Sequence, residues 1–334
     1  MNLVRAELER LAARRFVQLM VVLLIAAFGI TIATTLASSH QPTRAELVRA
    51  EEQVAQTRLE MERSYRDCLA SRRAGTMVGQ DPYPLVCTDL NPDRPGNVPT
   101  IEAFLYQVFV FDQQIRPLLY FLIAFLALFA FLVGASYIGA DLTSGGMTNL
   151  LLWRPQRMTV LGTKLGTLLG AVLAVSLPSS LLYLGSFWLI ARVGGLTGDP
   201  TAAFWNELSL TYLRGLVLVL AAGALGFSVA TLGRHTAAAL GTLAAYAVLW
   251  ELGARIVFEI IEVARPDQWM LSSYLGAWLA GRAEFWDKQA CQAVLSFCEA
   301  RYVITWRAGL VVLALVVAGA VAASFTAFRR RDLA

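Results

Sequence analysis

Four charged residues at helical spacing interrupt an otherwise apolar stretch and are the first candidates for chemistry in this sequence. They are Glu251, Arg255, Glu259 and Glu262. Steps of four and three residues place them on one face of a helix, and charges inside a membrane span are costly unless they are paired or wetted. Glu251 can pair with Arg255, and Arg255 also with Glu259. Two interpretations stay open: a structural ladder of ion pairs between helices, or a polar wall of a substrate pathway at a subunit interface that attracts cationic amphiphiles.

A second group of charged residues lies between two long apolar runs, in the segment Ile138–Lys164. Its polar and helix-breaking residues are Asp141, Gly145, Gly146, Arg154, Pro155, Arg157 and Lys164, and its apolar centre is Leu150–Trp153. The segment is too polar for hydrocarbon and too apolar for a solvated loop, which predicts a short amphipathic helix at the membrane surface. We expect a soluble partner to move the membrane part through this segment. The alternative is that the arginines only set topology and the Leu–Trp run only lies at the interface.

Residue sets typical of enzymes are absent from the sequence. The two histidines, His40 and His235, are too few for a His-rich metal site, and we assign them to opposite sides of the membrane. No HExxH, GxSxG or GxxxxGK[ST] pattern occurs. We therefore expect no catalytic residue, no metal site and no ATP site in this chain. The net charge of +4 forms no basic face, so nucleic acid is not expected as a partner.

The composition is that of a polytopic membrane protein. Hydrophobic residues make up 57% of the chain and charged residues 16%, with a mean hydropathy of +0.57. Apolar runs of about 20 residues or more, enough to cross the hydrocarbon core, predict an all-α fold with six transmembrane helices. We place these spans at about 16–38, 117–139, 160–190, 210–232, 237–263 and 305–325. In the third span, Gly162, Gly166 and Gly170 form a face that another helix can approach closely.

The segments between the spans have distinct characters. Residues 1–15 predict a cytoplasmic interfacial helix, unless they are only a basic flank that sets topology. Residues 39–116 predict an outer domain, which consists of a helix over Thr43–Arg73, an irregular Pro-rich loop, and an interfacial helix over Thr100–Arg116. Residues 140–164 form the central segment described above. Residues 264–304 predict a re-entrant outer segment, and residues 326–334 a cytoplasmic tail.

Basic residues and cysteines agree on the orientation. With both termini in the cytoplasm, the short inner segments carry an excess of arginine. All four cysteines, Cys68, Cys87, Cys291 and Cys298, then lie outside, where an oxidising environment would pair them. We favour Cys68–Cys87, which closes a Pro-rich loop. On an unbroken helix Cys291 and Cys298 would lie about 10 Å apart, beyond disulfide reach, so their segment must bend or the two outer segments are cross-linked. Free thiols are the alternative.

The ordered features of the central segment resemble the conserved loop of ABC-2 type transporter permeases, the membrane subunits of bacterial ABC exporters. The corresponding features are Gly139 with Asp141, Gly145–Gly146, Leu150–Trp153, Pro155 with Arg157, and Lys164 opening the third span. Asp141 stands where the family usually has Glu, and Gly146 where it usually has Thr. The layout is similar as well, with a lead-in helix, six spans, a re-entrant segment before the last span and a terminal Arg330–Asp332. Thr43–Thr100 is longer than the first outer loop common in the family.

The resemblance implies a permease subunit in the bacterial plasma membrane that pairs with a second copy of itself and with cytosolic ABC ATPase subunits. The ATPase would bind ATP and Mg²⁺, and this chain would hold no cofactor. The residues implied to couple to the ATPase are Asp141, Gly145, Gly146, Leu151, Trp153, Arg154, Pro155, Arg157 and Lys164. The implied activity is outward movement of an amphiphile, such as a drug, a peptide or a lipid-like molecule. The long outer domain favours a second hypothesis, in which ATPase-driven movement is transmitted to an envelope partner. A membrane enzyme is disfavoured by the missing catalytic set.

Overall fold

The computed structural model describes residues 3–74, 87–94, 96–147, 156–287 and 301–330. Within this part of the chain, six helices are long and apolar enough to cross a membrane. They are α2 (Arg15–Ser38), α4 (Phe111–Thr143), α6 (Arg157–Gly194), α7 (Ala202–Gly233), the composite helix Thr236–Ile260, and α12 (Trp306–Arg330). A shorter helix, α1 (Leu3–Ala12), precedes α2. The predicted all-α polytopic fold with six spans is confirmed.

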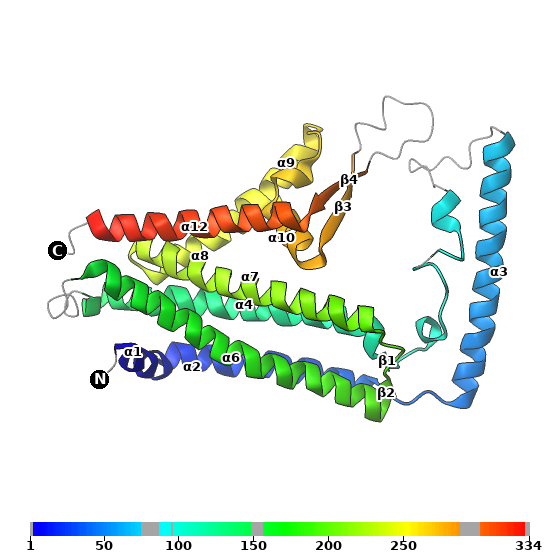
Figure 1. Cartoon of the computed structure of the whole chain (residues 1–334), viewed down its shortest axis with the longest axis horizontal. Coiled ribbons are helices and arrows are strands. Elements are labelled where there is room, and N and C mark those ends of the chain that lie inside the picture. The colour runs from blue at the N-terminus through cyan, green and yellow to red at the C-terminus, as the bar shows by residue number, and fades with distance from the viewer. Residues whose placement is uncertain (1–2, 75–86, 95, 148–155, 288–300, 331–334) are drawn as a thin grey trace.

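The spans run side by side, and α1 lies at the same end of the bundle as the last turn of α12 (Figure 1). We call this the terminal end and the opposite one the far end. Two of the helices, α4 and α7, form the centre of the bundle. In the most apolar stretch of 18 residues of each, 56% of the residues are buried, compared with 17% in the corresponding stretches of α2 and α12. Their backbones approach closely at Gly134 and Gly226, where an added Cβ would collide with the carbonyl oxygens of Gly223 and Phe131. Glycine permits this contact because it has no side chain.

The glycine face predicted on the third span has no neighbour in the part of this chain that the structure describes. A Cβ added at Gly162, Gly166 or Gly170 would meet no atom of the described residues within 4 Å. The close helix contact therefore lies between α4 and α7, and the glycine face of α6 is open.

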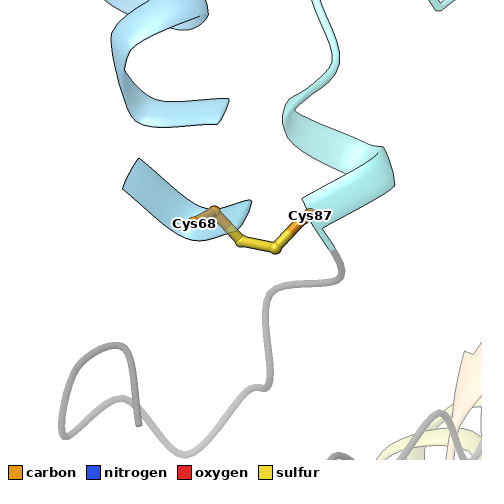
Figure 2. The surroundings of a disulfide bond; sticks show 2 residues. All are labelled: Cys68 and Cys87. Atoms are coloured by element: carbon orange, nitrogen blue, oxygen red, sulfur yellow. A yellow bond between two sulfur atoms is a disulfide. The ribbon is translucent and has the colours of Figure 1, made fainter. Parts of the chain in front are cut away.

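The segment after the first span contains α3 (Arg44–Ala74), a helix of 31 residues that stands apart from the bundle at the far end (Figure 1). It begins with a capping box. The Glu46 carboxylate accepts from the Thr43 backbone N–H at 2.7 Å, and the Thr43 hydroxyl accepts from the Glu46 N–H at 3.4 Å. Near its other end, Cys68 is joined by a disulfide to Cys87 in η1 (Cys87–Leu90), with the Cα atoms 5.6 Å apart (Figure 2). This is the pairing favoured from the sequence. Cys291 and Cys298 lie outside the described residues.

The interfacial helix predicted over Thr100–Arg116 is wrong. The structure has a short 3-10 turn, η2 (Ile101–Phe104), then the two-residue strand β1 (Phe109–Val110), and α4 begins at Phe111. The strand pairs in parallel with β2 (Gly195–Leu196), which directly follows α6. The ring of Phe111 contacts Trp188 and Trp205 at centroid distances of 5.2 and 5.9 Å. These tertiary contacts draw the aromatic residues into the bundle instead of leaving them on an interfacial helix.

The fifth span is built from three pieces. These are α8 (Thr236–Ala245), the π-helical stretch η3 (Tyr246–Ala254) and α9 (Arg255–Ile260). Only 6% of its most apolar window is buried in the chain. It diverges from the other spans toward the far end (Figure 1). A π-helix is rare in proteins, and those that occur are often found at functional sites.

The segment before the last span folds into η4 (Pro266–Trp269), α10 (Leu271–Ala280) and an antiparallel pair of strands, β3 (Arg282–Trp286) and β4 (Arg301–Thr305). Helix α10 packs against α7 and α12, where Trp278 meets Ala221 and Leu313. The Trp278 indole N–H also donates to the Arg214 carbonyl oxygen at 3.0 Å. The strands were not expected from the sequence.

Candidate functional site

Five polar residues from four segments meet at the terminal end of the bundle. Glu7 comes from α1, Arg14 from the turn between α1 and α2, Tyr137 and Asp141 from α4, and Lys164 from the first turns of α6. The Lys164 ammonium lies 2.7 Å from Glu7 Oε2 and 2.7 Å from Asp141 Oδ2. Arg14 forms an ion pair with the other oxygen of Asp141, and the Tyr137 hydroxyl donates to Glu7. We call these five residues the polar cluster.

The polar cluster is electrically balanced and largely removed from solvent. The side chains of Glu7 and Lys164 are only 1% and 2% exposed, while Arg14 and Asp141 are about one-fifth exposed. Two carboxylates face two cations, so each buried charge has an opposite charge at hydrogen-bonding distance, as burial requires. Both cations also lie over the Tyr137 ring, with Lys164 Nζ 4.9 Å and the Arg14 guanidinium 5.1 Å from its centre.

Backbone contacts fix Arg14 further. Its guanidinium donates to the carbonyl oxygens of Ser136 and Tyr137 at 3.1 and 2.9 Å. Because Arg14 is the residue directly before α2, these bonds attach the start of the first span to the end of the second. On the solvent side, Arg10 lies 3.4 Å from the second oxygen of Glu7. The cluster therefore joins the lead-in helix and three spans at one point.

The polar cluster contains residues from both ends of the central segment, which was predicted to contact a soluble partner. Helix α4 ends at Thr143, and Gly145 follows in a left-handed conformation with φ of +71°, which glycine adopts without strain. Arg157 begins α6 and is half-buried. Among the other residues predicted for coupling, Gly146 is described, whereas Leu151, Trp153, Arg154 and Pro155 lie outside the described residues.

Sequence reasoning selected Asp141 and Lys164 but missed Glu7, Arg14 and Tyr137. In the structure, Asp141 and Lys164 contact these three residues of the same chain. One signal for the missing residues was present: Glu7, Leu11 and Arg14 follow at steps of four and three, which puts an acidic and a basic residue on the same helical face as a leucine. Both Glu7 and Leu11 are buried. Tyr137 gave no such signal, because it sits among apolar residues of the second span.

The charged face of the fifth span does not form the ladder of ion pairs expected from the sequence. Glu251 instead accepts hydrogen bonds from the Ser272 N–H at 3.1 Å and the Ser272 hydroxyl at 2.7 Å, at the start of α10. The Tyr246 hydroxyl also donates to it at 2.7 Å. Arg255 pairs with Asp267 at 3.6 Å. The reason is that η4 and α10, in the segment before the last span, supply closer partners than the same helix does.

Arg255 also lines a cavity at the far end, together with the remaining two residues of this face, Glu259 and Glu262. Glu262 has a positive φ of 51° and lies just beyond the end of α9. The structure thus separates the four predicted residues into two sites, one at the start of α10 and one in the cavity. Among the described residues, no group of three or more His, Cys, Asp or Glu is placed to hold a metal ion.

The family model described as ABC-2 family transporter protein matches residues 1–333, which is nearly the whole chain. The chain belongs to the ABC-2 transporter family. Comparison with curated proteins and with solved structures finds no match. Membership makes the chain the membrane permease subunit of an ABC transporter, a class of subunit that is generally not catalytic and that works with an ABC ATPase. Six apolar helices agree with a multi-pass membrane protein.

Proposed function

We propose that this permease belongs to an exporter and that the central segment is the contact through which ATPase subunits drive it. In this proposal the partner ATPase holds ATP and Mg²⁺. Residues 144–156 lie against the ATPase, with Leu151 and Trp153 filling a groove and Arg154 and Arg157 making polar contacts. The substrate is an amphiphile such as a drug, a peptide or a lipid-like molecule.

The observation that carries the proposal is the polar cluster. Asp141 and Lys164 stand on the two sides of the central segment, and the buried ion pairs tie both to the lead-in helix. A push on the segment is therefore transmitted to α4, α6 and α1 together. Movement of packed elements as a rigid body is a common way to convert nucleotide closure into rearrangement of a bundle. In this account Asp141 and Lys164 position the segment instead of contacting the ATPase.

The orientation proposed is with both termini in the cytoplasm of a bacterial cell. Arg5, Arg10, Arg14 and Arg15 lie at the terminal end, where the positive-inside rule would place them. The Cys68–Cys87 disulfide then lies on the outer side, where such bonds persist.

A second copy of the chain is the permease partner we propose. The fifth span is the least covered of the six, with 6% of its most apolar window buried, and the glycine face of α6 is open. These observations support a surface that is uncovered within the chain. Both membrane lipid and a second copy can cover such a surface, and we propose the second copy. Measuring the mass of the purified complex in a lipid nanodisc tests it.

A specific observation favours the alternative, in which ATPase-driven movement reaches an envelope partner through the outer domain. Helix α3 is cross-linked to η1, and Asp89 of η1 pairs with Arg301 of β4 at 3.1 Å. Since β4 leads directly into α12, the outer domain is connected to the last span. This pair is one-third exposed on both sides, so it is a weak connection by itself.

The test uses the tagged full chain purified from its native membranes and reconstituted with the ATPase that accompanies it. Three forms are compared: wild type, Trp153→Asp, and a chain that lacks residues 44–94. The exporter proposal expects Trp153→Asp to lose the ATPase subunit and its activity, while the deletion keeps substrate-stimulated ATP hydrolysis. Loss of stimulated hydrolysis in the deletion alone would favour the alternative. Retention of the ATPase by Trp153→Asp would contradict the coupling proposal.

A further inference from the structure

A cavity of about 500 Å³ lies beside the end of the fifth span. It is bounded by α9 and the residues that follow it, by η4, and by β3, toward the far end of the bundle (Figure 1). Its volume is within the range of about 300–1,000 Å³ that is typical of small-molecule sites. Neither the polar cluster nor the central segment contributes to it.

The lining of the cavity has an excess of negative charge. Its ionisable residues are Arg255 and Arg265 against Glu259, Glu262, Asp267 and Glu284. Each arginine already has a carboxylate partner. Arg255 pairs with Asp267 at 3.6 Å, and Arg265 pairs at 2.7 Å with Asp287, which stands at the end of β3. Glu259 is exposed and makes no hydrogen bond or ion pair with any residue in the described part of the chain.

Aromatic residues supply most of the apolar part of the lining, which consists of Phe258, Phe285 and Trp286 together with Val263 and Pro266. The rings of the hairpin already attract cations of the protein. The Arg301 guanidinium lies 4.4 Å from the centre of the Trp286 ring, and that of Arg265 lies 5.4 Å from the Tyr302 ring, which stacks on Phe285. An aromatic face next to an unpaired carboxylate is the usual environment for an ammonium group.

We propose that this cavity binds an organic cation with an apolar body, such as a quaternary ammonium compound. The cationic group lies toward Glu259 and against the ring face of Phe258, and the apolar part lies along the rest of the lining. A metal ion is disfavoured, because the described carboxylates form no group that could ligate one. The inference rests on the proposed export function, for which it names the substrate class. It also explains why a span that is little buried within the chain carries carboxylates at its far end.

The test measures binding without any ATPase, so it does not depend on coupling. The full chain in lipid nanodiscs is titrated calorimetrically with benzyltrimethylammonium and separately with benzenesulfonate, two soluble aromatic ions of opposite charge. We expect saturable binding of the ammonium ion, at least about tenfold tighter than that of the sulfonate. If the ammonium ion does not bind in this way, the proposed substrate class is wrong. The export proposal is then still tested separately by the ATPase experiment above.

Two variants locate the site. Glu259→Gln removes the unpaired charge, and Phe258→Leu removes the aromatic face but keeps an apolar side chain; each should weaken ammonium binding by about threefold to tenfold. Glu207→Gln is the matched control, since Glu207 is an exposed carboxylate near the far end of α7 that pairs with Arg116 outside the cavity. It should bind like wild type. The proposal is overturned by absence of saturable binding, by equal affinity for both ions, or by an unchanged affinity in Glu259→Gln and Phe258→Leu.

Discussion

Removal of the Lys164 charge tests how strongly the polar cluster holds the bundle together. In Lys164→Met the Glu7 carboxylate, which is 1% exposed, loses a cation at 2.7 Å, and Asp141 loses one at the same distance. Two unit charges at this separation attract by about 6 kcal/mol at an effective dielectric constant of about 20. The cost of removing the ions from water opposes most of that attraction. Loss of one partner from a buried pair costs about 3–5 kcal/mol.

We expect a value near the lower end, about 3 kcal/mol, because Asp141 keeps Arg14, and Glu7 keeps the Tyr137 hydroxyl and its pair with Arg10. The free energy of unfolding is measured in mixed detergent micelles by the loss of helical circular dichroism as sodium dodecyl sulfate is added. The double variant Glu7→Gln/Lys164→Met should recover at least about 1 kcal/mol relative to the sum of the single changes, since the buried carboxylate that loses the Lys164 ammonium is no longer charged.

The control is Arg5→Gln, which breaks an ion pair on the same helix whose side chains are 79% and 62% exposed. An exposed pair contributes about 0–1 kcal/mol, so the control should stay close to wild type. The reasoning is refuted if Lys164→Met unfolds within about 1 kcal/mol of wild type, or if the double variant recovers nothing relative to the sum of the single changes.

Three further changes have expected outcomes. Gly226→Ala places a Cβ against the Phe131 carbonyl oxygen and should lower the free energy of unfolding by about 1–3 kcal/mol, whereas Gly166→Ala, which meets no atom within 4 Å, should be neutral in the same assay. Cys68→Ser opens a disulfide of sequence separation 19 and should destabilise the outer domain by about 3 kcal/mol, seen as faster proteolysis of α3 with unchanged helix content in the spans. Hydrogen bonds from the Thr43 backbone, the Thr43 hydroxyl and His40 lower the pKa of Glu46 from 4.5 to about 2, so the stabilisation of the α3 start is present above pH 4.5 and is lost as the pH falls toward 2. An NMR titration of the Glu46 carboxyl carbon should give a midpoint near pH 2. A midpoint near pH 4.5 would contradict the capping box.

The spans could be predicted from the sequence because hydrocarbon imposes a simple requirement of length and apolarity. The six predicted spans overlap the six observed ones, and the observed helices are mostly longer: α4 begins at Phe111 and not near Pro117. The extension comes from aromatic contacts with Trp188 and Trp205, which join residues far apart in the chain. Local composition holds no information on such contacts.

The polar cluster was only half visible in the sequence for the same reason. Asp141 and Lys164 drew attention as charges at the edges of spans, but their partner Glu7 lies more than 100 residues away and looked like part of a solvated face. The ion pairs predicted within the fifth span were wrong for a related reason. Helical spacing correctly put Glu251 and Arg255 on one face, yet Ser272 and Asp267 of the re-entrant segment are their partners.

The hairpin before the last span shows a third limit. Both strands alternate in exposure, and in β4 the residues Tyr302 and Ile304 are buried between exposed neighbours. The sequence of β4 does not show this alternation, because the exposed Val303 is as apolar as its buried neighbours, and residues 287–300 are too long a connection for the short turns that identify hairpins. The favoured Cys68–Cys87 pairing, by contrast, needed only proximity in the chain, and the structure contains it.

The most direct test of the central claim is to ask what residue 153 contacts in the working complex. A photo-crosslinking amino acid is installed in place of Trp153 in the full chain, and in a matched control in place of Val193, which is exposed near the far end of α6. The account predicts an ATPase crosslink from position 153 whose yield changes with bound nucleotide, and none from position 193. Equal yields from the two positions, or no ATPase crosslink from position 153, would contradict it.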